Sequence, residues 1–269
     1  MFVKPPGPRS QITERADTLV IRIPSRKNLF AIAFLLLILT TMAYSSTAPK
    51  ADIAAPSGDR HWLPKHNYLA SLVLQASRKP PLDIYFLGDS ITEFWPELGR
   101  EVWQAEFGKL HVVNCGVAGD TTQNILYRIT HGELDHVAPK VVVLLAGINN
   151  LGLYPGLQPD ELAGGLKRIV ATVRTKTPGS KILLLSIFPA GEATDPVRAR
   201  ILETNKRLAT LADDRSVFYL DIYEVFLDPE GNFPATISPD GLHLNAKGYQ
   251  IWADAMRPAL QKLLETSPP

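Results

Sequence analysis

The stretch IYFLGDSITEFW, residues 84–95, decides the fold of this 269-residue chain. It begins with apolar, strand-forming residues, and after Gly88-Asp89-Ser90 it continues with an amphipathic pattern typical of a helix. A serine at the end of a buried strand either caps the next helix or presents its hydroxyl to solvent as a nucleophile. The rest of the sequence has to distinguish these two roles of Ser90.

The body of the chain repeats this order of strand and helix. Short apolar runs predict strands at Ile84–Leu87, Val112–Cys115, Val141–Ala146, Ile182–Ile187 and Val217–Leu220. Helical patterns lie at about 97–107, 121–130, 159–176, 197–213 and 246–264. The alternation predicts an α/β fold with a right-handed parallel sheet. Because such sheets bind ligands outside the carboxyl ends of their strands, we expect the functional residues there.

The segment SPDGLHLNAKGY, residues 238–249, offers an acid and a base for Ser90. A short loop can direct Asp240 and His243 into one site, where the carboxylate would fix the imidazole tautomer. The alternative is a surface turn in which Asp240 caps and His243 is solvated. The sequence has no G-x-S-x-G motif, so the nucleophile elbow of the α/β-hydrolases is absent and serine chemistry would need another scaffold.

Two further strand ends carry candidate oxyanion donors. In GVAGDTT, residues 116–122, the glycines either shape a turn or let the N–H of Gly119 approach a substrate. A phosphate cradle is disfavoured there, because Asp120 would repel an anion and no lysine follows as in a P-loop. In GINN, residues 147–150, Asn149 either belongs to a turn or donates a side-chain N–H to an oxyanion.

Taken together, these blocks resemble the SGNH hydrolases, also called the GDSL family. The matching residues are Ser90 in GDSIT, Gly119 in GVAGDTT, Asn149 in GINN, and Asp240 with His243 in DGLH. The resemblance covers about residues 80–265. Within the family the chain is most similar to the platelet-activating-factor acetylhydrolase catalytic-subunit branch, through GDTTQNILYRITHGEL (119–134), PKVVVLLAGINN (139–150) and FPAGE (188–192).

The resemblance implies a three-layer flavodoxin-like fold with a sheet of about five strands. It implies a serine esterase that hydrolyses short-chain esters, above all acetyl esters, through an acyl-enzyme and without a cofactor or metal. Ser90 would be the nucleophile, His243 the general base and Asp240 its orienting acid. The N–H groups of Ser90 and Gly119 and the side chain of Asn149 would form the oxyanion hole.

Two positions depart from the family pattern. Asn150 stands where the wider family often has aspartate, which leaves Asn149 unaffected. Ala190 stands where the acetylhydrolase branch commonly has a basic residue, so the anionic contact of that residue is not expected here.

The front of the chain predicts a membrane segment. Residues 1–28 carry six basic and two acidic residues, a net charge of +4, and the span 29–46 is uncharged and mostly apolar. Its length and the preceding charges indicate a transmembrane signal anchor with a cytoplasmic tail at 1–28 and an extracytoplasmic body. A cleaved signal peptide is the alternative, since Ser46 and Ala48 are small. Residues 47–62, rich in small and polar residues, predict a linker to a hydrolase domain at 63–269.

Composition excludes several other classes of protein. The single cysteine excludes an internal disulfide framework, and no Cys/His cluster has zinc spacing. The total charge of +1 leaves −3 for the body, so nucleic acid is not an expected partner. The expected partners are a small-molecule or glycan ester and, through residues 29–46, a membrane. Two alternative functions remain: an O-deacetylase of envelope carbohydrate with the same triad, and a membrane-tethered binding module without catalytic activity.

Overall fold

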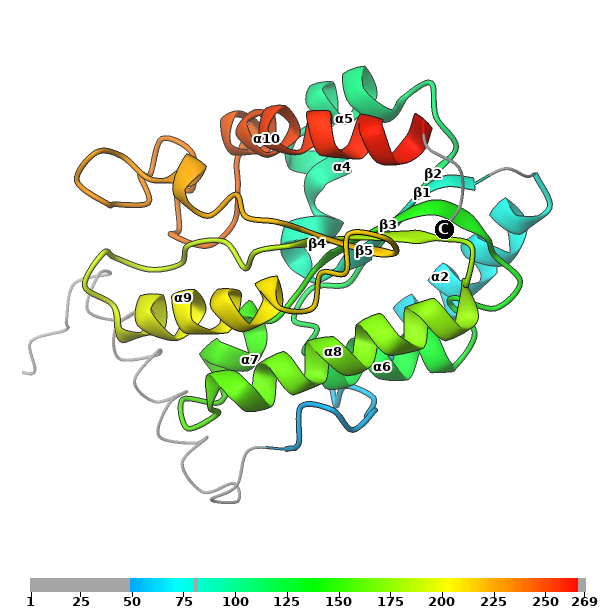
Figure 1. The fold of residues 1–269 in the computed structure, drawn as a ribbon, viewed down its shortest axis with the longest axis horizontal. Coiled ribbons are helices and arrows are strands. Elements are labelled where there is room, and N and C mark those ends of the chain that lie inside the picture. Colours follow the sequence, from blue (N-terminus) through cyan, green and yellow to red (C-terminus); the bar gives the residue numbers. More distant parts are fainter. Residues whose placement is uncertain (1–48, 80–81, 266–269) are drawn as a thin grey trace, which may run out of the picture. The chain divides into compact units, whose positions relative to one another are not determined.

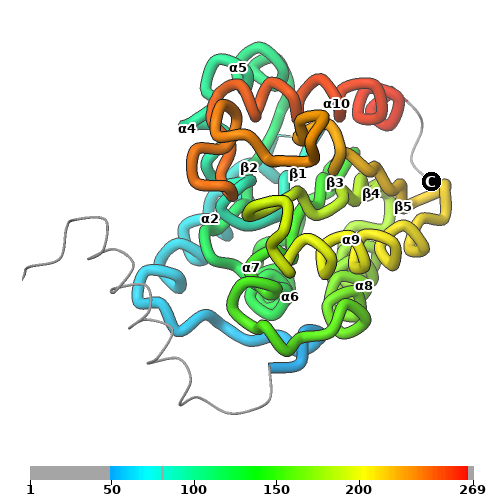
Figure 2. The backbone as a smooth tube through the Cα atoms, turned by 90° about the vertical axis from the view of Figure 1, so that its left-hand side faces the viewer, coloured from blue at the N-terminus to red at the C-terminus, as the bar shows by residue number. Residues whose placement is uncertain are grey.

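The computed structural model describes residues 49–79 and 82–265, and one parallel sheet organises them. Its strands are β1 (Leu82–Gly88), β2 (Val112–Gly116), β3 (Pro139–Leu145), β4 (Lys181–Leu185) and β5 (Val217–Leu220). They lie in the order β2-β1-β3-β4-β5, which Figure 2 shows from left to right. All neighbouring pairs are parallel, which confirms the predicted α/β class and five-stranded sheet.

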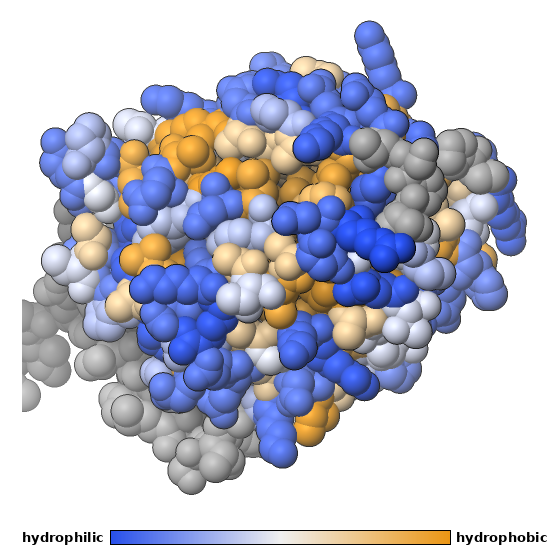
Figure 3. Space-filling model, in the orientation of Figure 1, coloured by the Kyte–Doolittle hydropathy of each residue, from blue (hydrophilic) through white to orange (hydrophobic). Residues whose placement is uncertain are grey.

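Helices cover both faces of the sheet (Figure 1). One layer holds α4 (Trp95–Leu98), α5 (Arg100–Phe107) and α10 (Ala246–Glu265), and the other holds α6 (Thr122–Thr130), α8 (Pro159–Lys176) and α9 (Pro196–Ala209). The remaining helices are α2 (Trp62–Ser77), the short α3 (Ser90–Glu93) and α7 (Ile148–Leu153), and the 3-10 turn η1 (Glu224–Phe226). On the face drawn in Figure 3, α8 and α9 present mostly hydrophilic surface, as expected for amphipathic helices.

Aromatic packing fixes the layer of α4, α5 and α10 against the sheet. The ring of Phe86 in β1 lies 5.8 Å from Trp95, 5.3 Å from Trp103 and 5.1 Å from Phe107, measured between ring centroids. Trp95 also packs at 4.2 Å from Trp252 of α10. Burying a large apolar side chain contributes roughly 1.5–3 kcal/mol, so this cluster holds three helices to the strand that precedes Ser90.

The strand order creates the position for a site. Strand β1 lies between β2 and β3, so the chain turns to one side after β1 and to the other side from β3 onward. Gly88 at the end of β1 pairs with Gly116 of β2 and with Leu145 of β3. The segments that follow these three strands therefore begin at one edge of the sheet, which is the crevice where parallel sheets bind ligands.

Several elements differ from their predicted form. The predicted helix at 97–107 is divided between α4 and α5 by Gly99, where a Cβ atom would lie 2.7 Å from the Tyr249 side chain. The predicted helix at 197–213 ends at Ala209. The GINN motif, considered as a turn, forms the first turn of α7, which the sequence pattern had not indicated.

The predicted cytoplasmic tail, residues 1–28, and the predicted transmembrane span, residues 29–46, lie outside the described residues. Within 49–79 and 82–265, no helix combines the length and apolar character needed to cross a bilayer.

Part of the predicted linker at 47–62 lies against the domain. The side chain of Ala51 is buried, and the N–H of Ala55 donates to the carbonyl of Gln123 in α6 at 3.1 Å. Asn124 donates its side-chain N–H back to the carbonyl of Ala55, also at 3.1 Å. Over these residues the linker is attached to the domain surface, and its last residue, Trp62, already begins α2.

Candidate active site

Ser90 is the first residue of α3, directly after β1 and Asp89. Asp89 caps the helix, because its side-chain Oδ1 accepts the N–H of Ile91 at 3.0 Å. Ser90 is buried apart from 5% of its surface, and its Oγ lies 2.9 Å from Nε2 of His243. The two roles considered for Ser90 are thus divided: Asp89 is the cap, and the Ser90 hydroxyl contacts an imidazole.

The loop before α10 brings His243 and Asp240 together. The Nδ1 atom of His243 lies 2.7 Å from Oδ2 of Asp240. The other carboxylate oxygen of Asp240 accepts the backbone N–H groups of His243, at 2.7 Å, and Leu242, at 3.0 Å. Gly241 has a φ of +72°, a conformation that favours glycine. The sequence-predicted trio therefore forms one continuous chain of hydrogen bonds from hydroxyl to carboxylate.

The electrostatics of the loop keep Asp240 ionised. Partial burial pushes the pKa of Asp240 upward, but the hydrogen bonds from the ring and backbone of His243 and from Leu242 outweigh it and lower that pKa below its usual value. An anionic Asp240 favours the tautomer with the proton on Nδ1, which leaves Nε2 able to accept a proton from Ser90. The side chains of His243 and Asp240 are 28% and 56% exposed, so a substrate can reach this side of the triad.

Gly119 and Asn149 follow the neighbouring strands β2 and β3. Gly119 has a φ of +78°, and no heavy atom outside its immediate neighbours lies within 4 Å of the place where a Cβ would stand. Asn149 lies in α7 and donates one side-chain N–H to the backbone carbonyl of Asp120 at 2.9 Å. The structure therefore links these two predicted oxyanion donors through the loop 117–120. Among the described residues the Asn149 side chain makes no second hydrogen bond, so its other amide N–H can donate to a ligand.

A buried ionic cluster supports this loop, and sequence reasoning missed it. The Asp120 carboxylate accepts the Nε–H of Arg128 at 2.7 Å and the indole N–H of Trp62 at 2.6 Å. Arg128 also pairs with Glu133, and its guanidinium donates to the carbonyl of Gly88 at 3.3 Å. The signal in the sequence was the presence of Asp120, Arg128 and Glu133 in one short segment. Charged side chains are buried only when they are paired, so the three could have been predicted to pair.

Burial raises the pKa values of Asp120 and Asp89, which follow β2 and β1. It raises the pKa of Asp120 to about 6, against the opposing effect of Arg128 and the hydrogen bond from Trp62. It raises the pKa of Asp89 to about 7, with the charge of Asp120 adding to the rise. Among the described residues, Oδ2 of Asp89 has no hydrogen-bond partner, which fits a carboxyl group that retains its proton near neutral pH.

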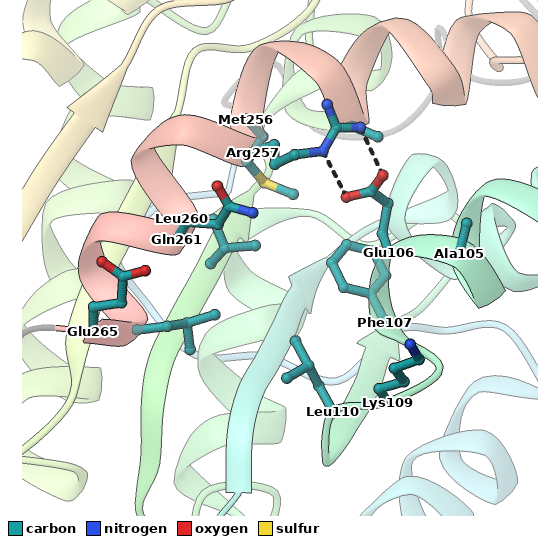
Figure 4. A pocket seen from close by; sticks show the side chains of 12 residues that line it. Ala105, Glu106, Phe107, Lys109, Leu110, Met256, Arg257, Leu260, Gln261 and Glu265 are labelled. Carbon is teal, nitrogen blue, oxygen red and sulfur yellow. Dashed lines mark hydrogen bonds and ion pairs between the residues drawn. The ribbon is translucent and has the colours of Figure 1, made fainter.

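A separate pocket of about 300 Å³ lies between α5 and α10 (Figure 4). Phe107, Leu110 and Leu260 give it an apolar lining. At its rim Arg257 donates to both carboxylate oxygens of Glu106, at 3.0 and 2.6 Å. None of the predicted site residues lines this pocket. Within the described ranges, no group of three acidic, histidine or cysteine side chains is placed to hold a metal ion.

Comparison with known proteins agrees with this geometry. The model of the GDSL-like Lipase/Acylhydrolase family matches residues 86–251. The chain is 34% identical over 212 residues to human platelet-activating factor acetylhydrolase IB subunit alpha2, covering 78% of this chain and 88% of that protein. It is 31% identical over 221 residues to the human alpha1 subunit, covering 82% and 90%.

Solved structures with the same fold include a GDSL-like lipase from Bacteroides thetaiotaomicron, with a TM-score of 0.60 at 19% identity, covering 74% of this chain and 98% of that one. An acetylxylan esterase from Geobacillus stearothermophilus gives a TM-score of 0.55 at 21% identity, covering 69% and 94%. The family match and the curated relatives together show that this chain is a carboxylic ester hydrolase that belongs to the GDSL-like lipase/acylhydrolase family, also known as the SGNH hydrolases.

Proposed function

We propose that this protein hydrolyses short-chain esters, above all acetyl esters, with Ser90 as nucleophile. The observation that carries the proposal is the hydrogen-bonded series from Ser90 through His243 to Asp240, with distances of 2.9 and 2.7 Å. Distances of this size allow proton transfer between a nucleophile and its base.

In the proposed mechanism, Ser90 Oγ attacks the ester carbonyl while His243 Nε2 takes its proton. The anionic Asp240 orients the ring and stabilises the imidazolium that forms. The N–H groups of Ser90 and Gly119 and the free amide N–H of Asn149 donate to the oxyanion. His243 then protonates the leaving alcohol, and a water activated by the same imidazole releases the acyl group from Ser90.

The acetyl preference is supported by the relatives, several of which are named acetylhydrolases or acetylxylan esterases. Two leaving groups fit this acyl preference: the lipid alcohol of a platelet-activating-factor-like ester, and a sugar hydroxyl of an acetylated carbohydrate. The partly exposed His243 and Asp240 favour the carbohydrate as a second candidate, because an open rim accommodates a polymeric leaving group. A binding module without catalysis loses its support, since all three triad residues are within hydrogen-bond distance.

We also propose that residues 29–46 hold the protein at a membrane with its catalytic domain outside the cytoplasm. The proposal is supported by the uncharged, apolar sequence of this segment and the basic residues before it. An extracytoplasmic position would bring the enzyme close to acetylated envelope carbohydrate.

Replacement of Ser90 tests the proposed reaction. Ser90→Ala should lower the turnover of a chromogenic acetyl ester by at least about 10³-fold, because the chain loses its nucleophile. It should also abolish labelling by a fluorophosphonate. Ser71→Ala, an exposed position in α2, should keep both properties. Retention of wild-type hydrolysis by Ser90→Ala would disprove the mechanism.

The substrate class needs a second measurement. Purified enzyme should cleave acetyl esters faster than long-chain acyl esters, and the reverse ranking would remove the acetyl preference. Parallel assays on a short-chain lipid ester and on an acetylated glycan then separate the two leaving groups.

A further inference from the structure

The linker segment 49–55 contacts the domain beside the residues that support the proposed oxyanion hole (blue in Figures 1 and 2). The carbonyl of Pro49 accepts the side-chain N–H of Gln123 at 3.0 Å, and the carbonyl of Ala51 accepts the hydroxyl of Thr122 at 2.8 Å. Ala51 is 2% exposed and packs on Gly165 of α8, where an added Cβ would lie 2.6 Å from the Ala51 oxygen. The linker is therefore closely fitted between α6 and α8.

On their other side, Thr122 and Gln123 hold Asn150, the residue after Asn149. The Asn150 side chain is fully buried, and its Oδ1 accepts the backbone N–H of Thr122 at 2.9 Å. Its Nδ2 donates to the hydroxyl of Thr122 at 3.2 Å and to Oε1 of Gln123 at 2.9 Å. Every hydrogen-bonding group of this amide is satisfied by the first turn of α6.

The linker carbonyls favour one direction for these bonds, and the Thr122 hydroxyl also lies 3.1 Å from Oε1 of Gln123. A hydroxyl has a single proton, so when Thr122 donates to Ala51 it presents a lone pair to Asn150. Gln123 likewise turns its NH₂ group to Pro49 and its oxygen to Asn150. Without the two linker carbonyls, both side chains could turn and leave a buried N–H of Asn150 unpaired, which is unfavourable.

We propose that the linker is a positioning element of the oxyanion hole, and that it acts through the three residues that bond α6, Pro49, Ala51 and Ala55. Asn149 and Asn150 are consecutive in α7, so the support of Asn150 also places the Asn149 amide. The same turn of α6 follows directly on the loop that carries Gly119 and Asp120. The inference rests on the proposed function, and it predicts that release of the linker slows the chemical step while substrate binding changes little.

Two matched pairs of variants in the full chain, purified in detergent, test the proposal. Gly165→Ala places a methyl group 2.6 Å from the carbonyl oxygen of Ala51 and 2.9 Å from the hydroxyl of Thr122, whereas Gly164→Ala adds the same methyl group where nothing lies within 4 Å. Ala51→Trp expels the linker from the opposite side of the contact, and Ala54→Trp makes the same change at an exposed linker position. Because each pair makes one chemical change in one element, a general effect on helix or linker cancels. Ala51→Trp substitutes only a linker residue, so it separates release of the linker from a direct effect of the Gly165→Ala methyl group on Thr122.

Two readouts are needed for each variant. Hydrogen exchange of peptides covering 51–56 reports whether the linker is released, because the N–H of Ala55 is bonded to Gln123 in the docked state. Steady-state kinetics on an acetyl ester report kcat and KM separately. We expect Gly165→Ala and Ala51→Trp to accelerate exchange and to lower kcat about tenfold with KM within about twofold. Gly164→Ala and Ala54→Trp should match the wild type.

The inference is overturned if Gly165→Ala or Ala51→Trp releases the linker and still keeps the kcat of its control. It is also overturned if exchange over 51–56 is already fast in the wild type, or is unchanged by both contact variants, because the linker is then not held as described. Failure of the inference leaves wild-type hydrolysis intact and dependent on Ser90. Failure of the proposed function removes that dependence, so the two outcomes are distinguishable.

Discussion

Asp89 and Ser90 divide two tasks at the end of β1. The carboxylate of Asp89 caps α3, and this leaves the Ser90 hydroxyl free to bond His243. The cost falls on Asp89, which is fully buried and has one oxygen without a partner among the described residues. Burial therefore raises the pKa of Asp89 to about 7 and makes the free energy of unfolding depend on pH.

The pH dependence has a definite sign. The pKa of Asp89 is raised from an ordinary value of 3.8 to about 7, so between these values the folded chain holds a proton that the unfolded chain has released. Its contribution to stability is complete below about pH 4 and is lost as the pH rises through about 7, by at most ~1.4 kcal/mol per pH unit.

Asp89→Asn should remove this contribution, because the amide keeps the capping oxygen but does not titrate. The free energy of unfolding, measured by urea titration from pH 5 to 8, should therefore fall with pH more steeply in the wild type than in the variant. A wild-type minus variant difference that stays constant over this range would mean that Asp89 does not titrate there.

Asn149 is the proposed oxyanion donor whose side chain can be replaced most directly, since the other two proposed donors are backbone N–H groups. Asn149→Ala should lower kcat by about 10²–10³-fold with little change in KM, because a donor to the oxyanion acts in the transition state. Asn232→Ala, in an exposed turn where the Asn232 side chain donates to Asp228, is the matched control and should leave kcat unchanged. A change confined to KM in Asn149→Ala would contradict the oxyanion role.

At the scale of elements, α3 lies against the end of β2, and this contact determines the position of Ser90 at the start of α3. A Cβ at Gly116 would lie 2.2 Å from the backbone nitrogen of Glu93 and 2.8 Å from the carbonyl of Asp89. Both are backbone atoms, which cannot turn aside as a side chain can. Only glycine allows strand and helix to approach this closely.

Gly116→Ala should therefore force α3 away from β2. We expect a loss of roughly 1–3 kcal/mol in the free energy of unfolding, together with slower ester hydrolysis, because Ser90 moves with α3. Gly152→Ala, in α7 with nothing within 4 Å of the added methyl group, should be neutral in both assays. Equal stabilities of the two variants would show that the close approach is not required.

Local signals explain which elements the sequence predicted well. Helix α8 begins and ends at the predicted residues, because Pro159 stands at its first turn and Gln158 with Glu161 forms a capping box. Helix α7 was not predicted, since two asparagines and a glycine have low helix propensity. Its first turn is instead held by contacts from α6 to Asn150, which are distant in sequence.

At the scale of the whole molecule, the described linker begins shortly after the predicted transmembrane span in the sequence. The span is predicted to end at residue 46, and the docked segment begins at Pro49. A signal peptide cleaved just before Pro49 and an uncleaved anchor would both leave Pro49 and Ala51 on the domain. The proposed support of the oxyanion hole is thus compatible with either form.

The proposed anchor can be checked in cells. The full chain should remain in the membrane fraction after alkaline carbonate extraction, because an uncharged segment of about 20 residues inserts stably. Mass spectrometry should find the uncleaved N-terminus. A mature chain that starts near Pro49 or Lys50 and appears in the soluble fraction would replace the anchor with a signal peptide.

The sequence by itself determined the order of the five strands and of the longer helices, the parallel sheet and the residues at its carboxyl edge. These follow from local propensity and hydrophobic pattern, and the motifs at strand ends carry their own chemical identity. Only the tertiary structure decided how Asp120, Arg128 and Glu133 pair inside the fold, and that residues 49–55 lie on α6. Such contacts depend on burial and on hydrogen bonds between segments up to 74 residues apart, which no local pattern records.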